Sequence, residues 1–308
     1  MQKKIEAIKK EISKAVVGQD AMVEGLLIGL FCEGHILVEG VPGLAKTTTV
    51  KALASALELG FKRIQFTPDL LPSDIIGAEI YDPQNNSFKI KQGPIFTQLL
   101  LADEINRSPS KVQSALLEAM QEKQVTIGEK SFDLPRPFMV MATQNPLEQE
   151  GVYRLPEAQL DRFMMKLLVE HNSEEDELEI MRRIATKSSE VVNAMVDSTA
   201  LEQISNEIEA LHIDEEVERY IVALIRATRA TTNEHIRYGA SPRASIDLYK
   251  ASKAHAYLAG KEFVTPVDVV SMAYSVLRHR VGLSYEARAK GIGVDEVLNT
   301  IIEKVDMP

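Results

Sequence analysis

Apolar residues in the first half of the chain fall into short runs that alternate with helical patterns. Five runs predict strands, at residues 35–39, 62–66, 99–103, 138–143 and 163–169. The runs LLLAD and FMVMAT are apolar at almost every position, which is typical of strands buried on both faces of a parallel sheet. Helices are expected at residues 20–31, at 47–59 with Gly60 as the stop, and at 111–121. This alternation predicts a βαβ architecture with helices on both faces of the sheet.

Two segments interrupt that alternation. GAEIYDPQNNSFKIKQGPIF (77–96) carries the turn residues DPQNN between two alternating runs, and QVTIGEKSFDL (124–134) repeats this form around Gly128 and Glu129. Both segments predict β-hairpins inserted into a framework of helices and parallel strands.

The second half of the chain has a different texture, because the strand-like runs end near His171. Residues 214–232 carry an apolar helical stripe. Ser241-Pro242 and Thr265-Pro266 each combine a cap residue with proline at the first helical position. We therefore expect an α/β domain at 1–171 followed by an all-helical lid domain at 172–308.

Composition and charge limit the classes of function and the cellular compartments that fit this chain. The net charge of −10 argues against broad nucleic-acid binding, which usually requires a basic surface. The single cysteine, Cys32, excludes an internal disulfide and fits a reducing cytoplasm. The N-terminus is charged and amphipathic, unlike a signal peptide. No apolar run reaches the roughly 20 residues of a membrane helix, so no membrane insertion is expected.

The stretch GHILVEGVPGLAKTTTVK (34–51) follows the phosphate-loop pattern G-x-x-x-x-G-K-[ST], except that Ala45 replaces the second glycine. The loop lies between a predicted strand and a predicted helix, so its N–H groups and the helix start would face phosphates. Lys46 would add a positive charge and Thr47 would bind Mg²⁺. We expect Ala45 to enter the helix with a negative φ. The alternative is a glycine turn with an incidental lysine.

Two further strands end in polar residues suited to phosphate chemistry. LLLADE ends in an acidic pair, in which Asp103 would hold Mg²⁺ through water and Glu104 would act as general base. FMVMATQNP places Asn145 where it could position the attacking water. The alternatives are a solvated acidic pair and a simple Asn-Pro turn.

Together these residues resemble the AAA+ ATPases and, among them, the MoxR family, over nearly the whole chain. The resemblance rests on VVGQD (16–20), GVPGLAKT (40–47), IQFTPDLLPSDIIG (64–77), LLADEINR (100–107, the Walker B segment), LPEAQLDRF (155–163) and GASPRA (239–244). The alanine at position 45 and both hairpins also match that family. The resemblance implies nucleotide contacts from Val17, Gly18, Gln19, Gly40, Val41, Pro42, Gly43, Leu44, Ala45, Lys46, Thr47 and Thr48.

The same resemblance implies a homo-oligomeric ring, usually of six subunits, with ATP and Mg²⁺ at the subunit boundary. Arg162 would be an arginine finger that reaches the γ-phosphate of a neighbour, and Arg243 would contact the phosphate of its own subunit from the lid. Without the resemblance, Arg162 would be a surface partner of Asp161 or Glu157, and Arg243 a helix-start arginine. His279 and Arg280 are expected to be solvated near a helix end.

The resemblance implies an ATP-hydrolysing motor that remodels protein clients in a chaperone-like way, with a partner that carries a von Willebrand factor A domain. One alternative is a chelatase-type or DNA-acting motor of the same clade. Basic side chains at the hairpin tips would favour DNA, but only a few are present, namely Lys89, Lys91 and Lys130. The other is a scaffold that binds ATP but barely hydrolyses it. The presence of Glu104 and Arg162 argues against the scaffold.

Overall fold

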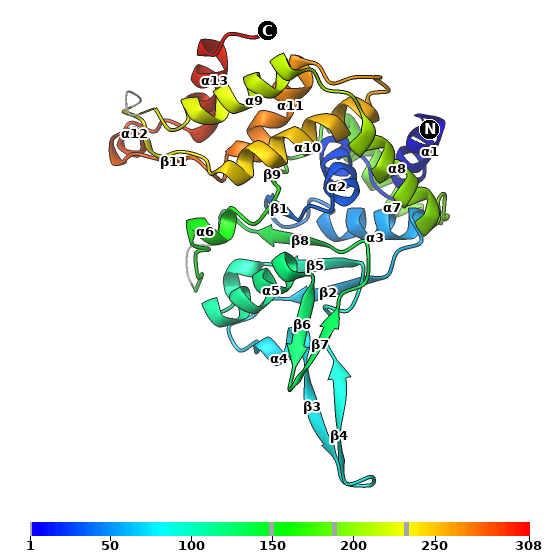
Figure 1. Ribbon diagram of the computed structural model, residues 1–308. Coiled ribbons are helices and arrows are strands. Elements are labelled where there is room, and N and C mark those ends of the chain that lie inside the picture. Colours follow the sequence, from blue (N-terminus) through cyan, green and yellow to red (C-terminus); the bar gives the residue numbers. More distant parts are fainter. Residues whose placement is uncertain (1, 148–150, 187–189, 231–233) are drawn as a thin grey trace.

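A computed structural model describes residues 2–147, 151–186, 190–230 and 234–308. Its centre is a five-stranded sheet, and Figure 1 shows the helical C-terminal half on one side of this sheet. The strands are β1 (Ile36–Glu39), β2 (Phe61–Gln65), β5 (Leu99–Asp103), β8 (Met139–Gln144) and β9 (Met165–Leu168). They run in the order β2-β5-β8-β1-β9, and every pair is parallel. The predicted fold class is confirmed.

Alternate residues of the central strands enter two different cores. Ile36 and Val38 of β1 pack with α1 (Gln2–Ser13), α2 (Asp20–Phe31), α3 (Lys46–Ala56) and the C-terminal helices. Leu37 faces the other way, toward α4 (Pro72–Ile76) and α5 (Ser110–Glu122). Both faces of the sheet are therefore buried, which explains why its strands are apolar throughout.

The first correction concerns the end of α3. The helix ends at Ala56, and Glu58 takes the left-handed turn with φ 52°. Gly60, the expected stop, is not among the positive-φ glycines. A left-handed residue commonly ends a helix and is usually glycine, so the sequence predicted the stop at Gly60 and not at Glu58.

Both predicted hairpins are present. β3 (Gly77–Asp82) pairs antiparallel with β4 (Ser87–Gln92), and β6 (Gln124–Ile127) pairs antiparallel with β7 (Lys130–Asp133). They project from the sheet on the side away from the C-terminal helices (Figure 1). Gly77 begins the first hairpin with φ +102°, and a Cβ there would lie 2.2 Å from the Lys91 carbonyl oxygen, so this position requires glycine.

In its described residues, the C-terminal half is helical apart from one small sheet. Its helices are α7 (Glu174–Ala185), α8 (Ser198–Ala210), α9 (Glu215–Ala227), α10 (Pro242–Leu258), α11 (Pro266–Leu277), α12 (Tyr285–Ala289) and α13 (Val294–Lys304). Ser241 and Thr265 cap α10 and α11 as predicted.

The expectation of an all-helical second half is wrong at one place. β10 (Ile236–Tyr238) pairs antiparallel with β11 (Gly282–Leu283). Strands this short contain too few positions to show a period of two. The helix expected at 214–232 ends at Ala227, and positions 231 and 232 lie outside the described residues. In the described part of the chain, none of the helices is both long and apolar enough to cross a membrane.

His35 lies just before β1 and is buried. Its Nδ1 accepts from the Val140 N–H at 3.0 Å, and its Nε2 donates to the Met120 carbonyl at 3.0 Å. This pattern requires the neutral imidazole, since a protonated Nδ1 would face another N–H. Burial lowers the His35 pKa to about 4.

A pH dependence of stability follows from His35. The unfolded chain, with a His pKa near 6.5, binds a proton that the folded chain resists down to about pH 4. Stability is therefore present above pH 6.5 and is lost as the pH falls from 6.5 toward 4. Between pH 7.5 and 5.0 this group should cost about 2 kcal/mol of unfolding free energy. Urea unfolding of the wild type and His35→Gln, whose amide cannot titrate, should show this difference. Equal pH dependence in the two proteins would contradict the assignment.

Candidate functional site

The phosphate-loop segment, residues 40–45, connects β1 to α3 as the sequence predicts. Ala45, the N-cap residue of α3, supplies no side-chain hydrogen bond to the first turn, so that turn's N–H groups are available to an anion. Gly43 has φ +91°, and a Cβ at this glycine would meet no atom within 4 Å. The loop therefore has room for a phosphate chain beside the helix start.

Ala45 does not have the conformation expected from the sequence. Its φ and ψ are 52° and 15°, in the left-handed region, and the helix begins one residue later at Lys46. As an N-cap residue, Ala45 lies outside the helix and keeps a non-helical backbone. For a residue with a Cβ this region costs roughly 1–2 kcal/mol, which explains why the general pattern has glycine here.

Lys46 closes over its own loop. Its Nζ donates to the carbonyl oxygens of Gly40 at 2.5 Å and Val41 at 3.1 Å. Burial lowers the pKa of Lys46, and the negative charges of Asp103 and Glu104 oppose that shift. The lysine therefore lies within electrostatic range of the acidic pair that the sequence selected.

Asp103 is the last residue of β5 and Glu104 follows it, and β5 lies between β2 and β8 in the sheet. The Thr143 hydroxyl donates to Asp103 Oδ1 at 2.6 Å and accepts from the Glu104 N–H at 2.9 Å. Arg63 Nη2 pairs with Asp103 Oδ2 at 2.5 Å. The pair is thus oriented by the neighbouring strands and is not simply solvated. Thr143 and Arg63 were not among the expected site residues, although each lies on one of the five predicted strands.

Glu104 has a left-handed backbone with φ 56°, which turns the chain sharply at the end of β5. Its carboxylate accepts from Gln65 Nε2 at 2.8 Å and Arg107 Nη1 at 3.0 Å. Strain at a non-glycine residue with this geometry is a feature of functional sites. Asn145 is nearly buried, and its Oδ1 accepts from the Leu147 N–H at 3.1 Å, so the turn interpretation holds. Its role in positioning water stays a prediction.

The donor set fits a nucleotide with Mg²⁺. Asp103 and Thr47 offer a carboxylate and a hydroxyl, the oxygen ligands that Mg²⁺ prefers. Among the described residues there is no cluster of three or more His, Cys, Asp or Glu side chains able to hold a metal alone. Mg²⁺ is usually held by one or two protein carboxylates together with substrate phosphates.

The segment expected near adenine is fixed to the start of the C-terminal half. Gln19 Nε2 donates to Asn172 Oδ1 at 2.5 Å, and Asn172 Nδ2 donates to the Val17 carbonyl at 3.4 Å. Gly18 has φ +72°, and a Cβ there would collide with the carboxylate of Asp176. A base bound at this segment would therefore lie beside both halves of the protein.

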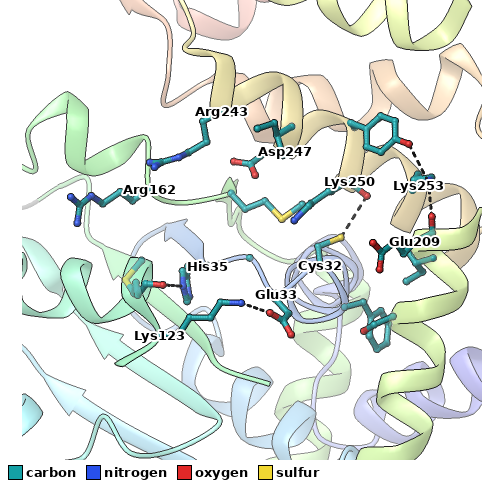
Figure 2. Close-up of a pocket in the computed structure, with 18 of the residues that line it drawn as sticks. Cys32, Glu33, His35, Lys123, Arg162, Glu209, Arg243, Asp247, Lys250 and Lys253 are labelled. Atoms are coloured by element: carbon teal, nitrogen blue, oxygen red, sulfur yellow. Dashed lines mark hydrogen bonds and ion pairs between the residues drawn. The ribbon is translucent and has the colours of Figure 1, made fainter. Parts of the chain in front are cut away.

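Arg162 and Arg243 lie together at the edge of the sheet formed by the amino ends of the strands. The phosphate loop lies at the opposite edge, at the carboxyl ends. Both arginines line a cavity of about 850 Å³, and both extend toward the same side of it (Figure 2). His35 lines this cavity at the start of β1, whereas Gly40 follows the end of β1. At about 3.3 Å per residue, these two positions are roughly 16 Å apart. Contrary to expectation, Arg243 does not lie beside the phosphate loop of its own chain.

Among the described residues, Arg162 has none of the ion pairs that a purely structural role would give it. Its Nη1 donates to the Leu117 carbonyl at 3.0 Å. In the described part of the chain it pairs with neither Asp161 nor Glu157, because the Asp161 carboxylate is taken by Ser241 and Arg280. The guanidinium is partly exposed, and its charge is not neutralised by these carboxylates.

His279 and Arg280 were expected to be solvated, and that expectation is wrong. Only 6% of His279 and 4% of Arg280 is exposed, and burial holds the pKa of His279 well below its usual range. Both side chains reach the backbone just before β9. A sequence shows that a polar residue follows a helix, but not whether another segment covers it.

Comparisons with known proteins identify the family. Residues 35–165 match the family described as "ATPase family associated with various cellular activities (AAA)", and residues 223–301 match an AAA lid domain. The chain is 44% identical to chaperone MoxR1 of Mycobacterium tuberculosis over 309 residues, covering 97% of this chain and 81% of that protein. The chain belongs to the MoxR family of AAA+ ATPases.

Other MoxR-family relatives extend over similar lengths. Protein MoxR of Methylorubrum extorquens is 30% identical, covering 97% of this chain and 94% of that protein. The solved structure of a provisionally assigned ATPase from Cytophaga hutchinsonii superposes with a TM-score of 0.94 at 49% identity, covering 100% of this chain and 96% of that one. Membership implies nucleotide binding, usually with Mg²⁺, and AAA+ proteins typically oligomerise.

Proposed function

We propose that this MoxR-family protein hydrolyses ATP to ADP and phosphate and uses the resulting conformational change to remodel protein clients, as a chaperone does. One observation supports the proposal most strongly. Lys46 follows a loop whose N–H groups are available to an anion. It lies within electrostatic range of Asp103 and Glu104, which the Thr143 hydroxyl holds in place. A positive charge and a strained acidic pair at the carboxyl edge of a parallel sheet suit phosphoryl transfer to water.

The side chains divide the chemistry between them. The N–H groups of residues 40–48 and the Lys46 ammonium would hold the β- and γ-phosphates, with Val17, Gly18 and Gln19 beside the base. Thr47 and Asp103 would hold Mg²⁺, which neutralises charge on the phosphate oxygens. Glu104 would orient the attacking water and accept its proton, with Asn145 as the second contact to that water.

The two arginines suit a neighbouring subunit better than their own. Arg162 and Arg243 lie together at the edge opposite the phosphate loop and extend to the same side (Figure 2). In a closed ring, one edge of each subunit meets the other edge of the next. We therefore place both arginines at the neighbour's γ-phosphate, in a homo-oligomer that the family resemblance suggests is hexameric. This replaces the expected contact of Arg243 with its own nucleotide.

The first hairpin favours a protein client over DNA. It exposes Ile80, Tyr81 and Phe88, and the two aromatic rings pack against each other with centroids 5.5 Å apart. Lys89, one of the few basic residues there, pairs with Asp82. An exposed apolar surface on which Lys89 is already paired suits a polypeptide better than a phosphate backbone. We further propose a partner that carries a von Willebrand factor A domain and a location in the cytoplasm. The boundary between the two domains is proposed near residue 171.

Lys46→Ala tests the nucleotide site. The substitution removes the positive charge that offsets the phosphates, so tight ATP binding should be lost, with Kd rising by about 100-fold or more. Binding of a fluorescent ATP analogue with Mg²⁺ would measure it. Lys51→Ala, an exposed lysine on the same helix α3, is the matched control and should bind as the wild type does. Unchanged affinity in Lys46→Ala would remove the loop from the site.

A further inference from the structure

Arg280 lies between α11 and β11, and only 4% of it is exposed. Its Nε donates to Asp161 Oδ1 at 2.9 Å. Its Nη2 donates to the backbone carbonyls of Asp161 at 3.1 Å and Phe163 at 2.8 Å. One planar guanidinium therefore holds the carbonyl oxygens on both sides of Arg162.

The remaining contacts of Arg280 leave none of its nitrogens unused. Nη1 donates to the carbonyls of Met164 at 3.3 Å and Val276 at 3.2 Å, and Nη2 pairs with Asp247 Oδ2 at 2.5 Å. A buried guanidinium is tolerated only when it is satisfied in this way. Its contacts join the chain around Arg162 to helices α10 and α11.

A second set of contacts holds the same segment from α10. The Ser241 hydroxyl, at the N-cap of this helix, lies 3.0 and 2.9 Å from the two carboxylate oxygens of Asp161. Arg243 Nη1 donates to the Asp161 carbonyl at 3.3 Å. His279, which is neutral because it is buried, donates from Nε2 to the Phe163 carbonyl at 2.9 Å. The segment before β9 is thus held at both ends by residues that follow position 172.

We propose that Arg280 is a positioning residue that joins Arg162 to the helical lid, here residues 172–308, so that the lid helps to set the direction of an arginine finger that α5 also contacts through the Leu117 carbonyl. The inference rests on the proposed role of Arg162 at the neighbour's phosphate. The lid begins beside the segment proposed to hold the base, where Asn172 contacts Gln19 and Val17. A lid that responds to its own nucleotide would therefore carry Arg162 toward or away from the next subunit, and the coupling of adjacent sites would pass through Arg280.

Arg280→Lys tests the proposal while keeping the positive charge. A lysine ammonium cannot reproduce the planar fork that spans both carbonyls and the carboxylate. Misplacement of a reacting group by about 1 Å can cost on the order of 100-fold in rate, so kcat of the assembled protein should fall by about ten- to a hundredfold. KM for ATP should change less than twofold, because the lost contacts lie at the edge opposite the phosphate loop. The mass of the oligomer in ATP and Mg²⁺ should be the same as that of the wild type.

The decisive readout is the same substitution made in an Arg162→Ala background and followed by single-turnover hydrolysis. If Arg280 acts through Arg162, Arg280→Lys should cause no further loss there. Arg278→Lys is the matched control, because Arg278 is also largely buried in the lid, where it pairs with Asp295 and donates to the Lys166 carbonyl, away from Arg162. It should turn over ATP at the wild-type rate.

The outcomes separate the inference from the proposed function. If Arg162→Ala has no effect, both are contradicted. If Arg162→Ala slows hydrolysis and Arg280→Lys slows it equally in both backgrounds, only the positioning role is overturned. Wild-type kcat in Arg280→Lys would overturn it too. Should Arg280→Lys fail to fold, Asp161→Asn is the second variant, because it removes the carboxylate charge that pairs with Arg280 at nearly constant volume. It should show the same dependence on Arg162, and an additive loss would contradict the proposal.

Discussion

Arg162→Ala is expected to lower ATP turnover of the assembled protein by about 10³–10⁵-fold. The transition state spreads negative charge over the phosphoryl oxygens, and a guanidinium from the neighbouring subunit would stabilise that charge. Arg162 suits this role because the one described hydrogen bond of its guanidinium is to the Leu117 carbonyl, and because the carboxylate of the preceding residue, Asp161, is held by lid residues.

The measurement is steady-state phosphate release at a protein concentration where the oligomer is assembled, with assembly checked by mass. Arg219→Ala is the control, since Arg219 forms an exposed pair with Glu215 on α9 and should contribute little. The loss should be confined to the assembled state. If isolated subunits lose the same factor, Arg162 does not act on a neighbour's nucleotide.

Glu104→Gln should bind ATP normally and hydrolyse it about 10²–10⁴-fold more slowly. The amide has nearly the same shape and can still accept from Gln65 and Arg107 through its oxygen, so the site should keep its structure. It cannot accept the proton of the attacking water, which is the role proposed for Glu104. Phosphate release and ATP affinity measured on the same sample separate the two effects.

Glu118→Gln, an exposed change on α5, is the control for the Glu104 variant. The wild-type rate also bears on the scaffold alternative. A wild-type rate no higher than that of Glu104→Gln would favour a protein that binds ATP without turning it over. A fast Glu104→Gln enzyme would mean that another residue orients the water.

Much of the α/β half was predictable because burial on two faces leaves a clear pattern. LLLAD and FMVMAT could be assigned as central strands, and polar residues at their ends had to meet at one edge of a parallel sheet. DPQNN likewise marked a turn by its residue types alone. Local chemistry determined these features, so local patterns were sufficient to identify them.

The features that could not be predicted depend on contacts between distant segments. Arg280 reaches Asp161 across 119 positions, and no local pattern distinguishes it from a solvated arginine. Arg243 was assigned to its own nucleotide because a motif identifies the residue but not the edge of the sheet on which the lid places it. Ala45 shows a smaller failure of the same kind, since one residue of error in the helix start reversed the expected sign of φ.

The shared site is the central claim, and mixing two inactive variants tests it most directly. Glu104→Gln keeps its arginine finger but cannot activate water, and Arg162→Ala keeps its acidic pair but has no finger to offer a neighbour. If the catalytic groups come from adjacent subunits, mixing the two proteins in ATP and Mg²⁺ should restore turnover well above that of either alone. If the mixture hydrolyses ATP no faster than the separate variants while mixed oligomers are shown to form by mass, each subunit works with its own residues and the account is contradicted.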